Sequence, residues 1–285
     1  MPPFLQPNAR FGPPGQQIAY RQVGSGPPLL MLHNGGASLA IWQHQIAHFA
    51  QRYTIYALDL PGFGASDRPE ATYGLDFYVG HLRHFITGLG LRGPTLMGNC
   101  IGAAMALTYA ERYPGEVSAL ILVNVCGGAS MMRHAHPYLF TRRGAPRSAL
   151  VYRWLFWPFR FEGIKRQIID RLYGARVQRD ELYLRLLAGI KHPQQPQSRL
   201  RLIHGMPSFS RFDHEPLDGT ALPPTLVCWG THNRVLPLHR GASFIARLGP
   251  TRWEVFPQAG HLLMAEAPEA FNQRVDRFLT KHATG

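Results

Sequence analysis

The feature that most constrains the fold is a repeated alternation of short apolar runs with segments of helical length. The apolar runs are residues 27–33, 53–59, 94–99 and 118–124. The helical segments are residues 40–51, 75–90 and 100–113. Continuous apolar runs, rather than strict alternation of polar and apolar side chains, are typical of parallel strands covered on both faces. The sequence therefore predicts an α/β fold with a mostly parallel central sheet flanked by helices and right-handed crossovers.

A single interruption divides this pattern. Residues 129–217 combine helical segments with clustered aromatic side chains and Arg, without strands between them. Strands at 223–230 and 251–257 and a helix at 268–280 then resume the sheet pattern. We expect the interruption to form a helical lid over the carboxyl ends of the strands, where open α/β sheets bind ligands. The expected division is a core of residues 1–128 and 218–285 and a lid of residues 129–217.

The positive charge of the chain is concentrated in the expected lid. The formal charge is +13, and between Met131 and Arg211 there are sixteen Lys or Arg against four acids. A basic face attracts acidic partners, such as a phosphate-bearing cofactor or an acidic protein, although it can also be a solvated helical surface. These cations lie among Leu, Phe and Trp, and no motif that recognises nucleic-acid bases accompanies them. We therefore do not expect a nucleic-acid partner.

Cysteine usage and apolar stretches bear on the cellular setting. Cys100, Cys126 and Cys228 are odd in number and lack paired spacing, which argues against a disulfide framework or a zinc site. The N-terminal residues lack a signal-peptide pattern, and no apolar stretch approaches membrane-spanning length. We therefore expect a cytoplasmic protein without membrane insertion, and no metal or cofactor.

A tight turn of the form Gly-x-nucleophile-x-Gly follows the third apolar run. In GNCIGA, which begins at Gly98, Cys100 stands at the central position where serine is usual. Gly98 and Gly102 leave room for the strand-to-helix turn that lifts this side chain above the sheet. The N-terminus of the following helix favours negative charge and should lower the pKa of the thiol. Cys100 is therefore the candidate nucleophile; the alternative is a small buried residue in an inactive relative.

The segment HNGGAS, residues 33–38, follows the first apolar run and is rich in small side chains. Backbone N–H groups from this turn and from the residue after Cys100 are candidates for an oxyanion hole. The expected donors are Gly35 and Ile101, with Asn34 or Gly36 as the next choices.

Two residues near the end of the chain complete the candidate site. His261, in QAGHLL, is the only histidine between the last expected strand and the final helix, which makes it the candidate general base. A carboxylate in THNRVLP, after the strand at 223–230, would orient this histidine, but the sequence has Asn233 there. The other plausible position, residues 125–128, has no acid either.

These motifs resemble those of the α/β-hydrolase fold family, in the same order and over nearly the whole chain. DLPGFGASD, residues 59–67, is similar to the signature of its lid-bearing esterase, epoxide hydrolase and dehalogenase branch. HNGG, GNCIGA, WGTHNRVLP and the final Gly-His pair follow the family's order. The resemblance implies the fold strongly and the substrate weakly, because this fold hosts many chemistries. This sequence departs from the family at two positions: Cys100 stands where Ser or Asp is common, and Asn233 stands where Asp is common. Because epoxide and halide substrates need a carboxylate nucleophile, Cys100 makes them unexpected.

The two departures fit each other. In a serine enzyme, Asp to Asn costs about ten-thousand-fold in rate because it presents the wrong histidine tautomer. A thiol is already partly ionised near neutral pH, so a cysteine enzyme needs the asparagine only to hold the imidazole by its side-chain carbonyl. We therefore expect a Cys100-His261-Asn233 triad that forms an acyl-cysteine intermediate.

The main hypothesis is a thioesterase or acyltransferase that acts on acyl-thioesters of coenzyme A or of an acidic acyl carrier protein bound at the basic lid. The acyl chain is expected to contact Trp154, Phe156, Trp157 and Asn99. Two enzymatic alternatives stay open: a carboxylester or lactone hydrolase, and a lyase or cyclase that forms no covalent intermediate. A catalytically silent binding protein is the alternative from another class.

Overall fold

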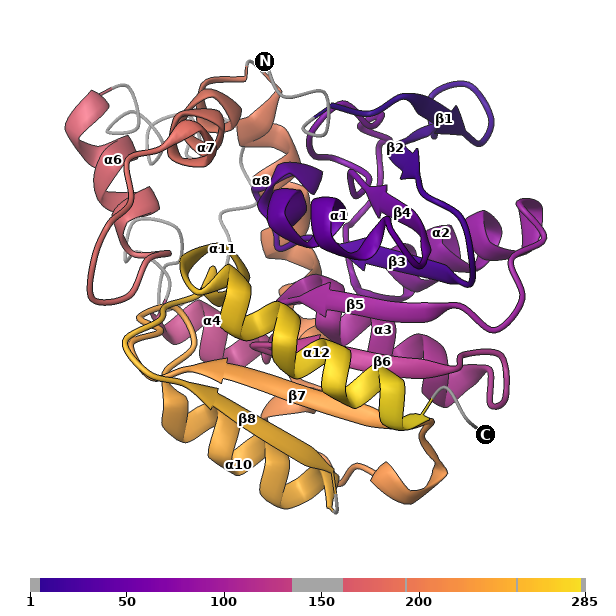
Figure 1. The fold of residues 1–285 in the computed structure, drawn as a ribbon. Helices are drawn as coiled ribbons and strands as arrows, with labels where there is room; N and C mark the ends of the chain where they lie inside the picture. The colour runs from indigo at the N-terminus through magenta and orange to yellow at the C-terminus, as the bar shows by residue number, and fades with distance from the viewer. Residues whose placement is uncertain (1–5, 135–160, 193, 250, 283–285) are drawn as a thin grey trace.

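The computed structural model describes residues 6–134, 161–192, 194–249 and 251–282. Its centre is an eight-stranded sheet of order β1-β2-β4-β3-β5-β6-β7-β8 (Figure 1). Strands β3 to β8 run parallel, whereas β2 pairs antiparallel with both β1 and β4. The strands are β1 (Ala9–Phe11), β2 (Ile18–Val23), β3 (Pro28–Leu32), β4 (Thr54–Leu58), β5 (Thr95–Asn99), β6 (Ala119–Val123), β7 (Thr225–Gly230) and β8 (Arg252–Phe256). The predicted α/β class is confirmed.

Each parallel strand lies where an apolar run predicted it, and the two antiparallel strands are an addition. β1 has only three residues, none of them buried, and the second half of β2 is partly exposed. β1 is an edge strand and β2 lies next to it, and the exposed residues in both interrupt the continuous apolar run that is typical of the buried parallel strands. The pattern that identified the parallel strands therefore did not identify these two.

Helices cover both faces of the sheet, and a separate apolar cluster fills each layer (Figure 1). The helices on one face are α1 (Gln43–Phe49) and α12 (Pro268–His282), and those on the other are α2 (Leu75–Gly88), α3 (Ile101–Arg112) and α10 (Leu238–Leu248). A 3-10 turn at Leu39–Trp42 precedes α1. The sequence analysis missed α10, although Gly241, Phe244 and Leu248 are buried at helical spacing.

Between β6 and β7 the described chain is helical; we call residues 124–224 the insertion. Its helices are α4 (Gly128–His134), α6 (Glu162–Asp170), α7 (Glu181–Lys191), α8 (Gln195–Gly205) and α9 (Arg211–His214), with 3-10 turns at Met206–Phe209 and Gly219–Ala221. Helices α6, α7 and α8 lie beyond the carboxyl ends of the parallel strands (Figure 1). The expected acyl contacts Trp154, Phe156 and Trp157 lie outside the described residues. No helix in the described ranges is both long and apolar enough to cross a membrane.

Several cations of the insertion take part in ion pairs within the protein. Arg211 pairs with Glu111 of α3 at 2.8 Å, and Arg201 pairs with Glu70 at 3.4 Å, which ties the insertion to the core. Within the insertion, Glu162 pairs with Lys165, Arg166 and Lys191. Exposed pairs of this kind each stabilise a fold little. They do mean that part of the basic charge already has acidic partners inside this chain.

Candidate functional site

Cys100 occupies a strained turn between β5 and α3. Its backbone has φ 57° and ψ −110°, a positive-φ region that residues other than glycine rarely adopt. Its N–H donates to the carbonyl of Val123 at 2.9 Å, which joins the turn to the end of β6. A Cβ at Gly98 would lie 2.3 Å from the carbonyl oxygen of Gly102, and a Cβ at Gly102 would lie 2.3 Å from that of Leu32. Backbone contacts thus require both glycines, as expected for a nucleophile elbow.

We expect Gly98→Ala to destabilise the fold by about 3 kcal/mol or more, because its methyl group would overlap the backbone of Gly102 and Ala103. Gly80→Ala in α2 is the matched control, since a Cβ there meets nothing within 4 Å. That variant should be unchanged or more stable by up to about 1 kcal/mol. Urea unfolding followed by circular dichroism measures both, and equal stabilities would contradict the packing argument.

His33 fixes the loop after β3 through hydrogen bonds at both ring nitrogens. Its Nε2 accepts from the N–H of Leu60 at 2.8 Å, so its Nδ1 carries the proton and donates to the carbonyl of Asn34 at 2.7 Å. Burial lowers the pKa of His33 to about 4, which keeps the ring neutral. The N–H of Ala37 donates to the same carbonyl at 3.2 Å. The loop that carries Gly35 is therefore held in one conformation.

Gly35 lies where this loop, the elbow and the insertion meet. A Cβ at Gly35 would lie 2.6 Å from Cδ2 of Leu202 in α8 and 3.6 Å from Cδ1 of Ile101. Among the described residues, none accepts a hydrogen bond from the N–H of Gly35. The structure therefore brings Gly35 and Ile101 together under Leu202, with Asn34 and Gly36 on either side of Gly35 in the chain. Their role as oxyanion donors stays a prediction.

His261 is fully buried and held by its backbone neighbours. Its N–H donates to the carbonyl of Leu172 in the insertion at 2.8 Å. The carboxylate of Glu266 accepts from the N–H of Gly260 at 2.9 Å and from that of Gly174 at 2.7 Å, so it ties the histidine loop to the insertion. Burial raises the pKa of Glu266. Glu266 was not predicted from the sequence, where the only signal for it is a carboxylate shortly after the candidate base.

Buried asparagines link the loops of the site. The amides of Asn124 and Asn99 both donate to the carbonyl of His261, at 3.1 and 3.3 Å. Asn99 also donates to Asn34 at 3.4 Å, and Asn124 accepts from the N–H of Gly230 at 3.4 Å. Asn99 therefore positions the histidine loop, and the substrate contact that the sequence predicted for it stays a prediction. Asn124 was missed, although it is a polar residue directly after an apolar strand.

Asn233 contacts His261, but not through the group that the sequence analysis expected. Its Oδ1 accepts from the N–H groups of Val235 at 3.0 Å and Leu236 at 2.8 Å. Its Nδ2 lies 3.2 Å from Nδ1 of His261. Since an amide nitrogen cannot accept from backbone N–H groups, this orientation is determined by the hydrogen bonds. The expectation that the side-chain carbonyl holds the imidazole is wrong, because that carbonyl is already used.

The orientation of Asn233 determines the tautomer of His261. Because Nδ2 donates, Nδ1 must accept, and the neutral imidazole then carries its proton on Nε2. That Nε2 atom is buried and has no hydrogen-bond partner of normal geometry within the described residues. A neutral His261 in this state can donate from Nε2 but cannot accept a proton there, so it is not a general base until the tautomer changes.

The surroundings of Cys100 favour the ionised form of its thiol. Its pKa is lowered, chiefly by a hydrogen bond from the thiol of Cys126. Burial opposes this effect, while the N–H of Ile101 adds to it. A lowered pKa favours the thiolate near neutral pH, and the thiolate is the nucleophilic form. The geometry is thus suited to attack by a preformed thiolate, and the sequence analysis had given Cys126 no role in it.

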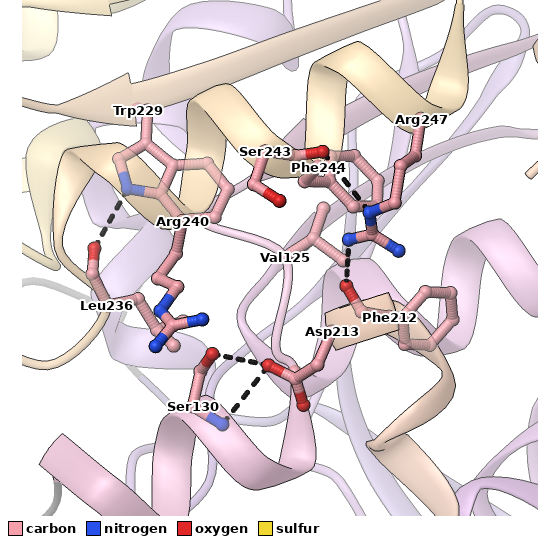
Figure 2. Close-up of a pocket in the computed structure, with 11 residues that line it drawn as sticks. Val125, Ser130, Phe212, Asp213, Trp229, Leu236, Arg240, Ser243, Phe244 and Arg247 are labelled. Atoms are coloured by element: carbon pink, nitrogen blue, oxygen red, sulfur yellow. Dashed lines mark hydrogen bonds between the residues drawn. The ribbon is translucent and has the colours of Figure 1, made fainter. Parts of the chain in front are cut away.

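A small polar cavity lies beside this site, between the end of β6, α9 and α10 (Figure 2). Its volume of about 10 Å³ suits a single water molecule, not a substrate. Asp213, one of its lining residues, accepts from the N–H groups of Ala129 at 2.7 Å and Ser130 at 3.1 Å and from the Ser130 hydroxyl. No acid follows β6 in the local sequence, but the insertion brings Asp213 to this place. The Asp213 carboxylate accepts hydrogen bonds from α4, and His261 is oriented by Asn233 instead.

Comparison with known proteins agrees with this architecture. A 2-hydroxy-6-oxo-6-(2'-aminophenyl)hexa-2,4-dienoic acid hydrolase of Metapseudomonas resinovorans is 28% identical over 280 residues, covering 94% of this chain and 89% of that protein. A thermophilic esterase from Thermogutta terrifontis has a TM-score of 0.75 at 22% identity, covering 97% of this chain and 100% of the esterase. The enol-lactonase from Burkholderia xenovorans LB400 has a TM-score of 0.76 at 17% identity, with 95% and 100% covered. Residues 27–268 match the α/β hydrolase fold family. This chain therefore belongs to the α/β hydrolase fold family.

Proposed function

We propose that this protein hydrolyses carboxylic esters or lactones through a covalent acyl intermediate on Cys100. The observation that carries the proposal is a cysteine with a lowered pKa at a nucleophile elbow, beside a buried histidine. The similarity to hydrolases, an esterase and a lactonase among them, favours ester or lactone hydrolysis over acyl transfer between thioesters. The sequence alone had favoured acyl-thioesters as substrates, with esters and lactones as the alternative; we now favour that alternative.

In the proposed reaction, the Cys100 thiolate attacks the carbonyl carbon of the ester and forms a carbon–sulfur bond. The carbonyl oxygen becomes an oxyanion that the N–H groups of Gly35 and Ile101 stabilise. Collapse of this intermediate breaks the carbon–oxygen bond and releases the alcohol part as its anion. Water then attacks the thioester carbon: one of its protons stays on the released carboxylic acid, the other neutralises the anion of the alcohol part, and the thiolate is restored.

The tautomer of His261 favours particular leaving groups. Its neutral ring has no spare proton, because donation from Nε2 while Nδ1 accepts from Asn233 would leave an imidazolate. An alkoxide leaving group needs a proton, whereas a phenolate or enolate leaves as a stable anion. We therefore propose aryl esters, enol esters and enol lactones as the preferred substrates.

Acyl-thioesters are the second candidate. A thiolate leaving group also departs without a proton, and the basic residues of the insertion suit phosphates or an acidic carrier protein. Lys165 and Arg185 already pair with acids of the insertion, so docking would rely on the remaining charge. Ester activity that is independent of salt, with no preference for coenzyme A thioesters, would favour the hydrolase.

The decisive measurement is the intact mass of the protein after brief mixing with an aryl ester, an alkyl ester and a coenzyme A thioester of the same acid. We expect the aryl ester to add the mass of one acyl group, and Cys100→Ala to abolish that gain. Cys228→Ala, a buried cysteine of β7, is the matched control and should acylate normally. No adduct with any donor would overturn the proposal and favour a non-covalent lyase or a silent binding protein.

A further inference from the structure

We propose that Cys126 is a second functional thiol of the site: it donates its S–H to the Cys100 sulfur and thereby positions this residue and keeps it as a thiolate. The inference rests on the proposed function, since it assigns a positioning residue to the same nucleophile. Cys126 is here a positioning residue, because it acts on substrate only through Cys100.

The backbone brings the two cysteines together. Asn124, directly after β6, has φ 46°, and this left-handed residue turns the chain out of the strand direction. The N–H of Cys126 then donates to the carbonyl of Cys100 at 3.2 Å. From the other side, the N–H of Cys100 donates to the carbonyl of Val123 at 2.9 Å. Cys100 is thus held between two residues of the β6 end, and the backbone contact limits the Cα–Cα separation of the cysteines to at most about 7 Å.

Burial makes a protein donor necessary. The side chains of Cys100 and Cys126 are both fully buried, so water is not at hand to solvate a thiolate. The groups that act on the Cys100 sulfur are the thiol of Cys126, the imidazole of His261 and the N–H of Ile101. The pKa of Cys126 is raised, by its bond to Cys100, by burial and by the charges of Cys100 and Asp213. The two pKa values move in opposite directions, which supports the proposal that Cys126 is the donor of the pair.

Cys228 shows what a merely structural buried cysteine looks like in the same protein. It lies in β7, in the apolar cluster on the other face of the sheet. Burial raises its pKa, and no thiol bond contributes to the shift. Cys126 differs because it belongs to the cluster that contains Cys100 and hydrogen-bonds to the backbone of that residue.

The test is the pH dependence of Cys100 alkylation by iodoacetamide, read from the mass of the Cys100 peptide. A lowered pKa gives a reaction that is fast above the midpoint and slows as the pH falls through it. Loss of a hydrogen bond to a charged group should raise the midpoint by about one to two pH units in Cys126→Ala. Cys126→Ser keeps a donor and should retain most of the low midpoint, and Cys228→Ala should match the wild type.

The outcomes separate this inference from the proposed function. If wild-type Cys100 accepts acyl groups but Cys126→Ala and Cys228→Ala have the same midpoint as wild type, the role of Cys126 is wrong and the proposed function stands. If Cys100 is unreactive in every folded variant, both fail.

Mild hydrogen peroxide gives a second measurement: it converts the Cys100 thiolate to a sulfenic acid, and attack by Cys126 releases water and forms a disulfide about 2 Da lighter than the dithiol. Over-oxidation of Cys100 in place of that disulfide would contradict contact between the thiols.

Discussion

Replacing Cys100 with serine is expected to lower aryl-ester hydrolysis by about a thousandfold or more, and adding Asn233→Asp is expected to restore much of the loss. A serine hydroxyl is protonated at neutral pH and needs a general base. In this tautomer Nε2 of His261 cannot serve as that base, because Nδ1 accepts from Asn233 and the proton of the neutral ring is on Nε2. A serine at this position would therefore have no partner able to take its proton.

The second substitution supplies that partner. In Asn233→Asp, one carboxylate oxygen can keep the bonds from Val235 and Leu236, which now end on Oδ1. The other oxygen replaces Nδ2 opposite His261 and accepts the Nδ1 proton, which frees the Nε2 lone pair. Initial rates with an aryl ester, on variants of verified stability, test the pair. If Cys100→Ser keeps activity within tenfold of wild type, or the double variant is no better than the single one, the tautomer argument is wrong.

Asn233→Asp alone is expected to shorten the lifetime of the acyl-cysteine by about a hundredfold or more. Attack of water on the thioester needs a base, and in the wild type His261 must first change its tautomer. We therefore expect wild type to show a burst of phenolate release followed by slow turnover, and the variant to show fast turnover without accumulation. The preference for aryl over alkyl esters should also narrow, because an imidazolium held by a carboxylate can protonate an alkoxide.

The matched control for this variant is Asn272→Asp. Asn272 is a buried asparagine of α12 whose Oδ1 accepts from Gln45 at 2.9 Å, within the layer on the other face of the sheet. It should leave the burst and the slow phase unchanged. Quenched-flow mass measurements give the acyl-enzyme lifetime directly. A lifetime that is equal in the wild type and in Asn233→Asp would show that the asparagine does not limit hydrolysis.

Some of the candidate site could be predicted because its requirements are local. Cys100 was identifiable because a strand-to-helix turn needs Gly98 and Gly102 at fixed offsets, and the structure places a backbone carbonyl against each of those glycines. His261 and Asn233 were identifiable because they follow late strands, and the carboxyl ends of parallel strands share one edge of the sheet. The orientation of the Asn233 amide also had a local signal, since its Oδ1 bonds to residues two and three positions on.

Other parts depend on segments far apart in the sequence. Leu202 covers Gly35, and Leu172 accepts from the N–H of His261, because the insertion folds back over the core. Asp213 reaches the end of β6 from α9, about ninety residues away, where no acid was found in the local sequence. Such contacts satisfy buried polar groups by proximity in space, and no local pattern specifies which partner arrives.

The sequence alone was enough to predict the six parallel strands, the elbow and the candidates Cys100, His261 and Asn233, because apolar runs and glycine spacing act through neighbouring residues; it did not predict β1, β2 or α10. Only the tertiary structure decided how these residues interact. The Nδ2 atom of Asn233, not its carbonyl, faces His261, and Cys126 meets Cys100 across the end of β6. The bonds to Val235 and Leu236 fix the amide orientation locally, but the contact of that amide with His261 and the contact between the two cysteines form only when loops far apart in the sequence pack together.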